Sequence, residues 1–121
     1  MILVVDDNDI VREMQVAVLE SANYTVCDAA DGIKALALTE HVCPELVLMD
    51  ITMPGMTGYQ VLEKLRERYG QDLPIVLVSA LPEEDERDRA IANGATDYIS
   101  KPFDIPHILR CVKQYLPAKV A

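Results

Sequence analysis

Residues 46–50 read Leu-Val-Leu-Met-Asp, an unbroken apolar run that ends in a carboxylate. Residues 2–7, Ile-Leu-Val-Val-Asp-Asp, have the same form, and residues 75–79, Ile-Val-Leu-Val-Ser, are a similar run that ends in a hydroxyl. Short apolar runs without alternation are typical of strands that are buried on both faces of a parallel sheet. These three segments therefore predict central strands whose carboxyl ends carry polar side chains.

Weaker strand patterns and helical patterns fill the intervals between these runs. Residues 24–29 and 97–99 are expected to form strands nearer the sheet edges. Apolar residues at helix spacing predict one helix after each strand, and we expect Asp9 to cap the first of these helices. The other predicted helices begin near Gly32, Gly58, Glu83 and Ile105.

The expected order is thus a strand followed by a helix, five times. Short loops and right-handed crossovers then predict a doubly wound α/β fold, a (βα)5 three-layer sandwich with helices on both faces of a parallel sheet. The flavodoxin-like strand order 2-1-3-4-5 is the common solution at this size. We expect a single domain over residues 1–121.

Composition excludes several classes of function. The formal net charge of −9 argues against direct nucleic-acid binding by this domain and fits basic partners or bound cations. The longest apolar runs are strand-sized, so no membrane span is expected. Three cysteines without metal-like spacing, and no secretory leader, favour reduced thiols in a cytoplasmic protein.

Polar side chains follow the central strands at the edge where ligands bind in this architecture. These side chains are expected to converge on one end of the sheet. They are those of Asp6, Asp7, Asp50, Ser79 and Lys101. Carboxylates about 4 Å apart repel by roughly 4 kcal/mol per pair at an effective dielectric constant near 20. A proton or a cation must relieve this repulsion, and oxygen ligands suit Mg²⁺.

We expect Asp7 and Asp50 to bind that ion directly, and Asp6 to bind it directly or through a water molecule. A backbone carbonyl just after Asp50 could complete the protein's ligands. A carboxylate such as that of Asp50 can form an aspartyl phosphate. Lys101 and the Ser79 hydroxyl suit two oxygens of the phosphoryl group. With no evident general base or substrate pocket, turnover of an external substrate is not expected.

Four segments, in order and over essentially the whole chain, resemble the receiver domain of bacterial two-component response regulators, which implies a CheY-like fold. They are Val4-Val5-Asp6-Asp7-Asn8, residues 49–58, Val78-Ser79-Ala80 and residues 94–103. The resemblance implies that Asp50 is the phosphoacceptor and that Asp6 and Asp7 are the acidic metal-binding pair. The ion would be Mg²⁺, for which Mn²⁺ can substitute.

The resemblance also implies roles for the remaining positions. The carbonyl of Thr52 would bind the metal, Ser79 would be the switch hydroxyl and Tyr98 the switch aromatic. Lys101 would contact the phosphoryl group, and the Lys101–Pro102 bond would be cis. Ala80 would leave room for the phosphoryl group.

Partners follow from the same resemblance. A histidine kinase or a histidine phosphotransfer protein would phosphorylate Asp50. The surface of the fourth helix, fifth strand and fifth helix would control an output protein or effector domain. His107 and Cys111 replace an acid and an arginine of the winged-helix subfamily's dimer interface, so a monomer or a weak phosphorylation-dependent dimer is expected. A stand-alone regulator and a receiver cut from a longer protein both remain open.

Three other functions compete with this one. A haloacid dehalogenase-type phosphatase would carry an Asp-x-Asp motif after the first strand, where this chain has adjacent acids. A flavodoxin would need a hydroxyl- and glycine-rich phosphate loop there. A phosphorylation-independent pseudo-receiver that only binds proteins is disfavoured by the full set of site residues.

Overall fold

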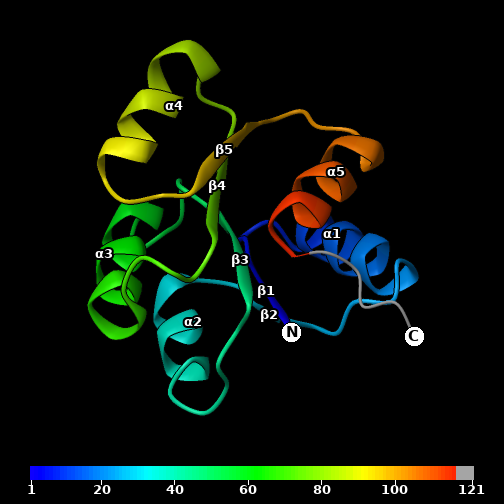
Figure 1. Ribbon diagram of the computed structural model, residues 1–121, viewed down its shortest axis with the longest axis horizontal. Helices are drawn as coiled ribbons and strands as arrows, with labels where there is room; N and C mark the ends of the chain where they lie inside the picture. Colours follow the sequence, from blue (N-terminus) through cyan, green and yellow to red (C-terminus); the bar gives the residue numbers. More distant parts are fainter. Residues whose placement is uncertain (117–121) are drawn as a thin grey trace.

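One parallel sheet organises the chain. The computed structural model describes residues 1–116; the tail through Ala121, which the sequence assigns to the same domain, lies outside them. The five strands run in the order β2-β1-β3-β4-β5 (Figure 1), which confirms the predicted topology. The strands are β1 (Ile2–Val5), β2 (Val26–Ala29), β3 (Leu46–Asp50), β4 (Ile75–Ser79) and β5 (Asp97–Ser100). The helices are α1 (Asp9–Ser21), α2 (Gly32–Leu38), α3 (Gly58–Tyr69), α4 (Glu83–Ala92) and α5 (Ile105–Tyr115).

The apolar runs form the centre of the sheet, as predicted. Every residue of β1, β3 and β4 is buried, whereas the edge strands β2 and β5 are partly exposed. The register pairs Val5 with Met49, Asp50 with Val78, and Ser79 with Ser100. The carboxyl ends of the central strands therefore finish side by side, so the residues that follow them meet at one edge.

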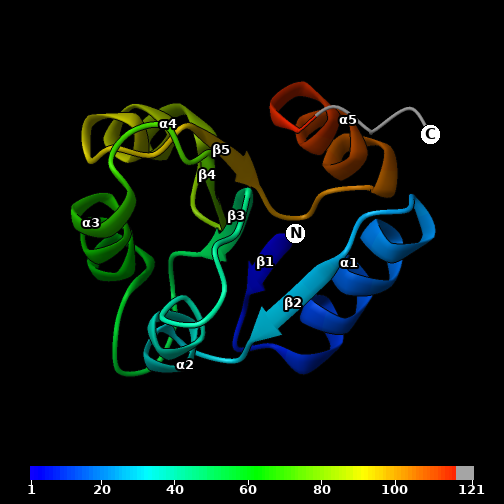
Figure 2. The same cartoon turned by 60° about the horizontal axis from the view of Figure 1, so that its bottom comes forward.

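Helices cover both faces of the sheet. Figure 2 shows α1 and α5 on one side and α2, α3 and α4 on the other. Alternate residues of each central strand point to opposite faces. Leu3 and Met49 therefore join the core under α2 and α3, while Val4 and Leu48 join the core under α1 and α5.

Helix caps agree with the predicted boundaries with one correction. The N-cap of α1 is Asn8, whose side-chain oxygen accepts a hydrogen bond from the backbone N–H of Val11 at 3.0 Å. Asp9 is already the first helical residue and instead pairs with Arg12. The expectation that Asp9 caps the helix was wrong by one position, because both residue types cap well and the backbone decides between them.

The thin apolar stripe of α4 is also present in the structure. Within residues 1–116, Ala90 is the one apolar side chain of α4 in the core, and Ile91 is 46% exposed. Polar contacts supplement it, because Glu86 is buried and accepts a hydrogen bond from the hydroxyl of Tyr59 on α3 at 2.6 Å. Helix α4 is therefore attached to the domain with little buried apolar area.

Two further predictions concern the chain as a whole. None of the helices in residues 1–116 combines the length and the apolar character needed to cross a bilayer. Cys27, Cys43 and Cys111 are free thiols, as expected from their odd number and spacing.

The core predicts how two isoleucine substitutions will differ. Ile75→Ala removes a fully buried side chain from β4 and should lower the free energy of unfolding by about 2–5 kcal/mol. Ile10→Ala makes the same chemical change where the side chain is 80% exposed and should change stability by less than about 0.5 kcal/mol. Urea denaturation followed by circular dichroism measures both, and equal losses would contradict this core.

Candidate functional site

The site lies at the carboxyl edge of the sheet, where three central elements deliver polar side chains. Asp6 follows β1, Asp50 ends β3 and Ser79 ends β4. Lys101 follows β5, and its backbone N–H donates a hydrogen bond to the Ser79 carbonyl oxygen at 2.7 Å. The Lys101–Pro102 peptide bond is cis. The backbone of β4 thus fixes the point from which the Lys101 side chain departs.

Three carboxylates gather here. One carboxylate oxygen each of Asp6, Asp7 and Asp50 lies within 4.8 Å of the other two. Asp6 and Asp50 are buried, and Asp7 is exposed. At these separations the carboxylates repel each other, and burial removes much of the water that would screen the repulsion. The cluster therefore favours a bound cation.

Lys101 bridges the two buried carboxylates. Its Nζ donates hydrogen bonds to Asp6 Oδ2 and Asp50 Oδ2, each at 3.1 Å. Burial would lower the pKa of the Lys101 ammonium, but the hydrogen bond and charge of Asp50, together with those of Asp6, raise it overall. Lys101 therefore stays charged and supplies one positive charge to a cluster of three acids.

The pKa of Asp50 is raised above the ordinary carboxyl value. Burial is the main cause, and the neighbouring charge of Asp6 acts in the same direction. Lys101 and the backbone N–H of Thr52, which donates to Asp50 Oδ1 at 3.1 Å, oppose this effect without cancelling it. The two hydrogen bonds thus hold Asp50 in a defined orientation, while burial and Asp6 destabilise its ionised form.

Backbone contacts hold Asp50 from behind. The N–H of Gly58 at the start of α3 donates to the Ile51 carbonyl oxygen at 2.7 Å. A Cβ atom at Gly58 would lie 2.5 Å from the Asp50 carbonyl oxygen and 2.8 Å from the Ile51 Cα. Any side chain there would push α3 away from the site, so Gly58 does more than begin a helix, which is all that the sequence pattern indicated for it.

Ser79 and Tyr98 are joined through Leu81. The backbone N–H of Leu81 donates to Ser79 Oγ at 3.2 Å, and the hydroxyl of Tyr98 donates to the Leu81 carbonyl oxygen at 2.7 Å. Tyr98 is fully buried, on the inner side of β5. One residue, Leu81, therefore binds both predicted switch side chains, a connection that their positions in the sequence did not reveal.

Two residues beside Asp6 were missed by sequence reasoning. The N–H of Asn8 donates to Asp6 Oδ1 at 2.9 Å, and Arg12 Nη1 donates to the Asp6 carbonyl oxygen at 2.8 Å. A basic residue three positions after Asp9 was the available signal, but such a pair is common on helix surfaces. These contacts fix the orientation of the segment that carries Asp6 and Asp7.

The donor set fits a magnesium ion. Only carboxylate oxygens make up the cluster, and hard cations prefer oxygen ligands. Soft transition metals favour sulfur or imidazole, and neither occurs in the cluster. The carbonyl of Thr52 as a further ligand stays a prediction.

Comparison with known proteins agrees with this geometry. The family model of the response regulator receiver domain matches residues 2–113. The chain is 34% identical over 116 residues to the DNA-binding dual master transcriptional regulator RpaA of Synechocystis, covering 95% of this chain and 48% of RpaA. It is 37% identical over 113 residues to the phosphate regulon transcriptional regulatory protein PhoB of Escherichia coli, covering 93% of this chain and 49% of PhoB. The chain thus spans about half the length of these two relatives.

A solved structure gives the same result for the fold. The chemotaxis protein CheY4 of Vibrio cholerae superimposes with a TM-score of 0.89 at 30% sequence identity, covering 95% of this chain and 97% of CheY4. Such agreement over nearly the full length of both chains means that the two proteins share the whole architecture and not one motif.

The raised pKa of Asp50 predicts a stabilising substitution. The folded state binds the proton of Asp50 more tightly than the unfolded state, so this carboxylate lowers stability as pH rises above its ordinary pKa. Asp50→Asn removes that effect while Lys101 keeps Asp6 as a partner. Without divalent cations, the variant should be more stable than the parent at pH 7, and the difference should shrink as pH falls below about 4.

Urea denaturation at a series of pH values measures this difference. Asp72→Asn is the matched control, because Asp72 is an exposed acid outside the cluster and its substitution should leave stability nearly unchanged. An Asp50→Asn variant no more stable than the parent at pH 7 would show that burial and Asp6 do not destabilise the ionised form of Asp50.

Proposed function

The chain belongs to the response regulator receiver domain family, and we propose that it is a working receiver in which Asp50 accepts a phosphoryl group. The donor would be a histidine kinase or a histidine phosphotransfer protein of a two-component system. The observation that carries the proposal is the double hydrogen bond of Lys101 to Asp6 and Asp50 inside a three-carboxylate cluster. A solvated surface acid would not share a half-buried ammonium with a second, buried acid.

The chemistry assigns each side chain one task. A carboxylate oxygen of Asp50 attacks phosphorus, an O–P bond forms, and the bond between phosphorus and the donor's leaving atom breaks. Lys101 shifts its ammonium toward an oxygen of the transferred group. The Ser79 hydroxyl donates to another oxygen, and the movement of its Oγ toward the phosphoryl group would break the hydrogen bond that it accepts from the Leu81 N–H.

Asp6, Asp7, Asp50 and the carbonyl of Thr52 would hold the Mg²⁺ or Mn²⁺ ion. When bound, the ion supplies positive charge that offsets the negative charge of the phosphoryl group. Asp7 is the exposed member of the cluster and leaves one side of the site open to water and to the donor. The three carboxylates without an ion would repel an incoming phosphate, which is why phosphorylation should require the metal.

Loss of the Ser79–Leu81 bond links phosphorylation to the distal surface. Leu81 also accepts the hydrogen bond of Tyr98, so a shift of Leu81 changes the support of Tyr98 in β5. Reversal of a 1:99 population ratio needs a preference of about 5.5 kcal/mol, more than one charge-assisted bond supplies. Lys101, Ser79 and the metal would therefore act together on the surface formed by α4, β5 and α5.

The output partner follows by analogy with the longer relatives. RpaA and PhoB are named as transcriptional regulators and are about twice as long as the match. An effector domain or separate protein that reads α4, β5 and α5 is therefore proposed for this chain. Arg87 of α4 is paired with Asp97 of β5 within one chain. That pairing supports a monomer or a weak dimer.

Phosphorylation is tested by intact-mass spectrometry after incubation with acetyl phosphate and Mg²⁺. One added phosphoryl group is expected on the parent protein and on Asp72→Asn, and none on Asp50→Asn or after chelation of the metal. No adduct under any condition, with no beryllofluoride complex either, would favour the pseudo-receiver. Multiple turnovers of a generic phosphatase substrate would favour the phosphatase alternative.

The switch is tested separately by NMR of the ¹⁵N-labelled protein with beryllofluoride. Amide shifts in α4, β5 and α5 should change in the parent, whereas Ser79→Ala should still bind beryllofluoride but show much smaller changes on that surface. Ser21→Ala is the control, since this hydroxyl donates to the Val18 carbonyl oxygen at the carboxyl end of α1, the opposite end of that helix from Asp6 and Asp7. Equal changes in Ser79→Ala and the parent would rule out the proposed route through Leu81.

A further inference from the structure

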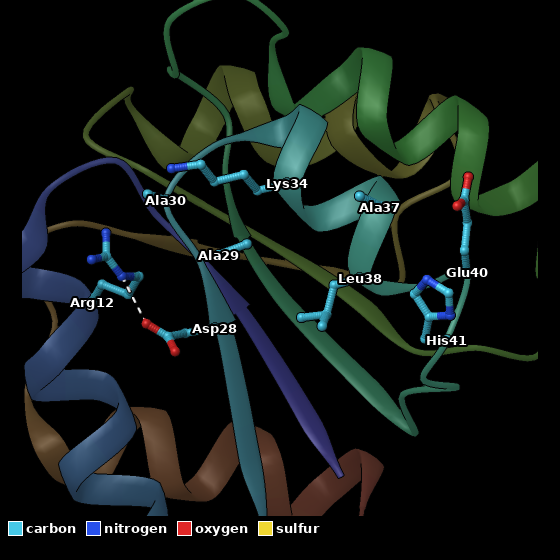
Figure 3. A pocket seen from close by; sticks show the side chains of 9 residues that line it. All are labelled: Arg12, Asp28, Ala29, Ala30, Lys34, Ala37, Leu38, Glu40 and His41. Atoms are coloured by element: carbon cyan, nitrogen blue, oxygen red, sulfur yellow. Dashed lines mark hydrogen bonds and ion pairs between the residues drawn. The ribbon is translucent and has the colours of Figure 1, made fainter.

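Arg12 ties the segment that carries the acidic pair to the edge strand β2. Its side chain is 13% exposed, which is low for an arginine near the start of a surface helix. Besides the bond from Nη1 to the Asp6 carbonyl oxygen, Nε donates to Asp28 Oδ2 at 2.9 Å and Nη2 donates to Asp9 Oδ1 at 2.7 Å. Figure 3 shows Arg12 reaching from α1 to Asp28 on β2, at the border of an open groove between β2 and α2.

The bond to Asp6 acts directly on the position of Asp7. The Asp6 carbonyl and the Asp7 N–H belong to one planar peptide unit, so the orientation of that oxygen determines the direction in which Asp7 departs. The other groups of Asp6 are also held, because its N–H donates to the Ala29 carbonyl oxygen and its carboxylate binds Lys101. Without Arg12, the peptide between the two acids would lose the bond that orients its carbonyl.

The three bonds need the shape of a guanidinium. Arginine offers donors in a fixed planar fork, whereas lysine offers one compact charge. Asp28 comes from β2, Asp9 from α1 and the Asp6 carbonyl from the end of β1, so the fork joins three separate elements. Two carboxylates and a carbonyl oxygen also neutralise and fix the guanidinium, so the site does not gain a mobile cation.

We propose that Arg12 is a positioning residue of the metal site, which holds the Asp6–Asp7 peptide in the orientation that Mg²⁺ binding requires. The three bonds of Arg12 go to the Asp6 carbonyl oxygen, Asp9 and Asp28 and to no carboxylate of the cluster, and β2 takes part through Asp28. The inference rests on the proposed function, since it assumes that Asp6, Asp7 and Asp50 bind Mg²⁺.

Calorimetric titration with MgCl2 tests the proposal. Loss of a residue that orients a metal ligand through a hydrogen bond typically weakens metal affinity about 10–100-fold. Arg12→Ala should therefore weaken Mg²⁺ binding about tenfold. Arg12→Lys retains the charge without the fork and should recover only a minor part of that loss. Asp28→Asn removes the negative charge of the Nε partner on β2, so it weakens that bond and should reduce Mg²⁺ affinity less than Arg12→Ala does.

Arg68→Ala is the matched control for a merely structural effect. Arg68 also donates to a backbone carbonyl, that of Leu36, but outside the cluster. This variant should lose stability and keep the parent's Mg²⁺ affinity. Phosphorylation by acetyl phosphate provides a second readout: Arg12→Ala should need about tenfold more Mg²⁺ for half-maximal rate, with a rate near the parent's at saturating Mg²⁺.

Several outcomes would overturn the positioning role of Arg12 or the proposed function. Unchanged Mg²⁺ affinity in a folded Arg12→Ala variant, or full recovery by Arg12→Lys, would overturn the positioning role. If Arg12→Ala does not fold, Asp28→Asn decides instead, and parent-like affinity in that variant would overturn the proposal. Failure of the parent protein itself to bind Mg²⁺ would reject the proposed function, a result distinct from parent-like binding by the variants.

Discussion

Mutual repulsion of three carboxylates at one edge of the sheet is the constraint on which the site depends. When all three are ionised, Lys101 offsets one charge and two negative charges remain. Two of the acids are also buried, where repulsion is screened less than in water. A chain that keeps such an arrangement must hold it rigidly, and its unbound state favours cations over phosphate. The hydrogen bonds from Asn8, Arg12 and Thr52 hold Asp6 and Asp50 in place against this repulsion.

The parallel sheet provides most of the rigidity. In-register central strands place Asp6, Asp50 and Ser79 at one edge without any long loop. The other end of the sheet is closed by Arg66 of α3, which donates to the carbonyl oxygens of Leu73 and Gly94 before β4 and β5. Burial lowers the pKa of Arg66, yet it still binds several carbonyls. One edge of the sheet is thus fixed by neutral acceptors, and the charged edge is free to bind ligands.

Periodicity predicted the strands, because short unbroken apolar runs such as 46–49 and 75–78 are typical of a buried parallel sheet. The strand order and the site edge followed from the common arrangement of such a sheet at this size. The contacts of Arg12, Gly58 and Leu81 were not predictable in the same way. Arg12 acts on the backbone carbonyl of Asp6, and Leu81 acts through its own backbone N–H and carbonyl. Gly58 acts through the side chain it lacks. Such contacts depend on three-dimensional placement and leave no residue pattern. The roles of Thr52 and Tyr98 likewise came from family resemblance and not from periodicity.

Helix α4 is attached to the domain in a way that suits the proposed switch. It buries little apolar area and is held by directional polar contacts, from Glu86 to Tyr59 and from Arg87 to Asp97 and the Tyr98 carbonyl oxygen. Burial and the bond to Glu86 raise the pKa of Tyr59, so its hydroxyl stays a donor even above the pH at which a free tyrosine ionises. Apolar contacts weaken gradually when surfaces slide, whereas hydrogen bonds have few favourable geometries. A helix attached in this way therefore tends to have discrete positions, which is the property that a switch requires.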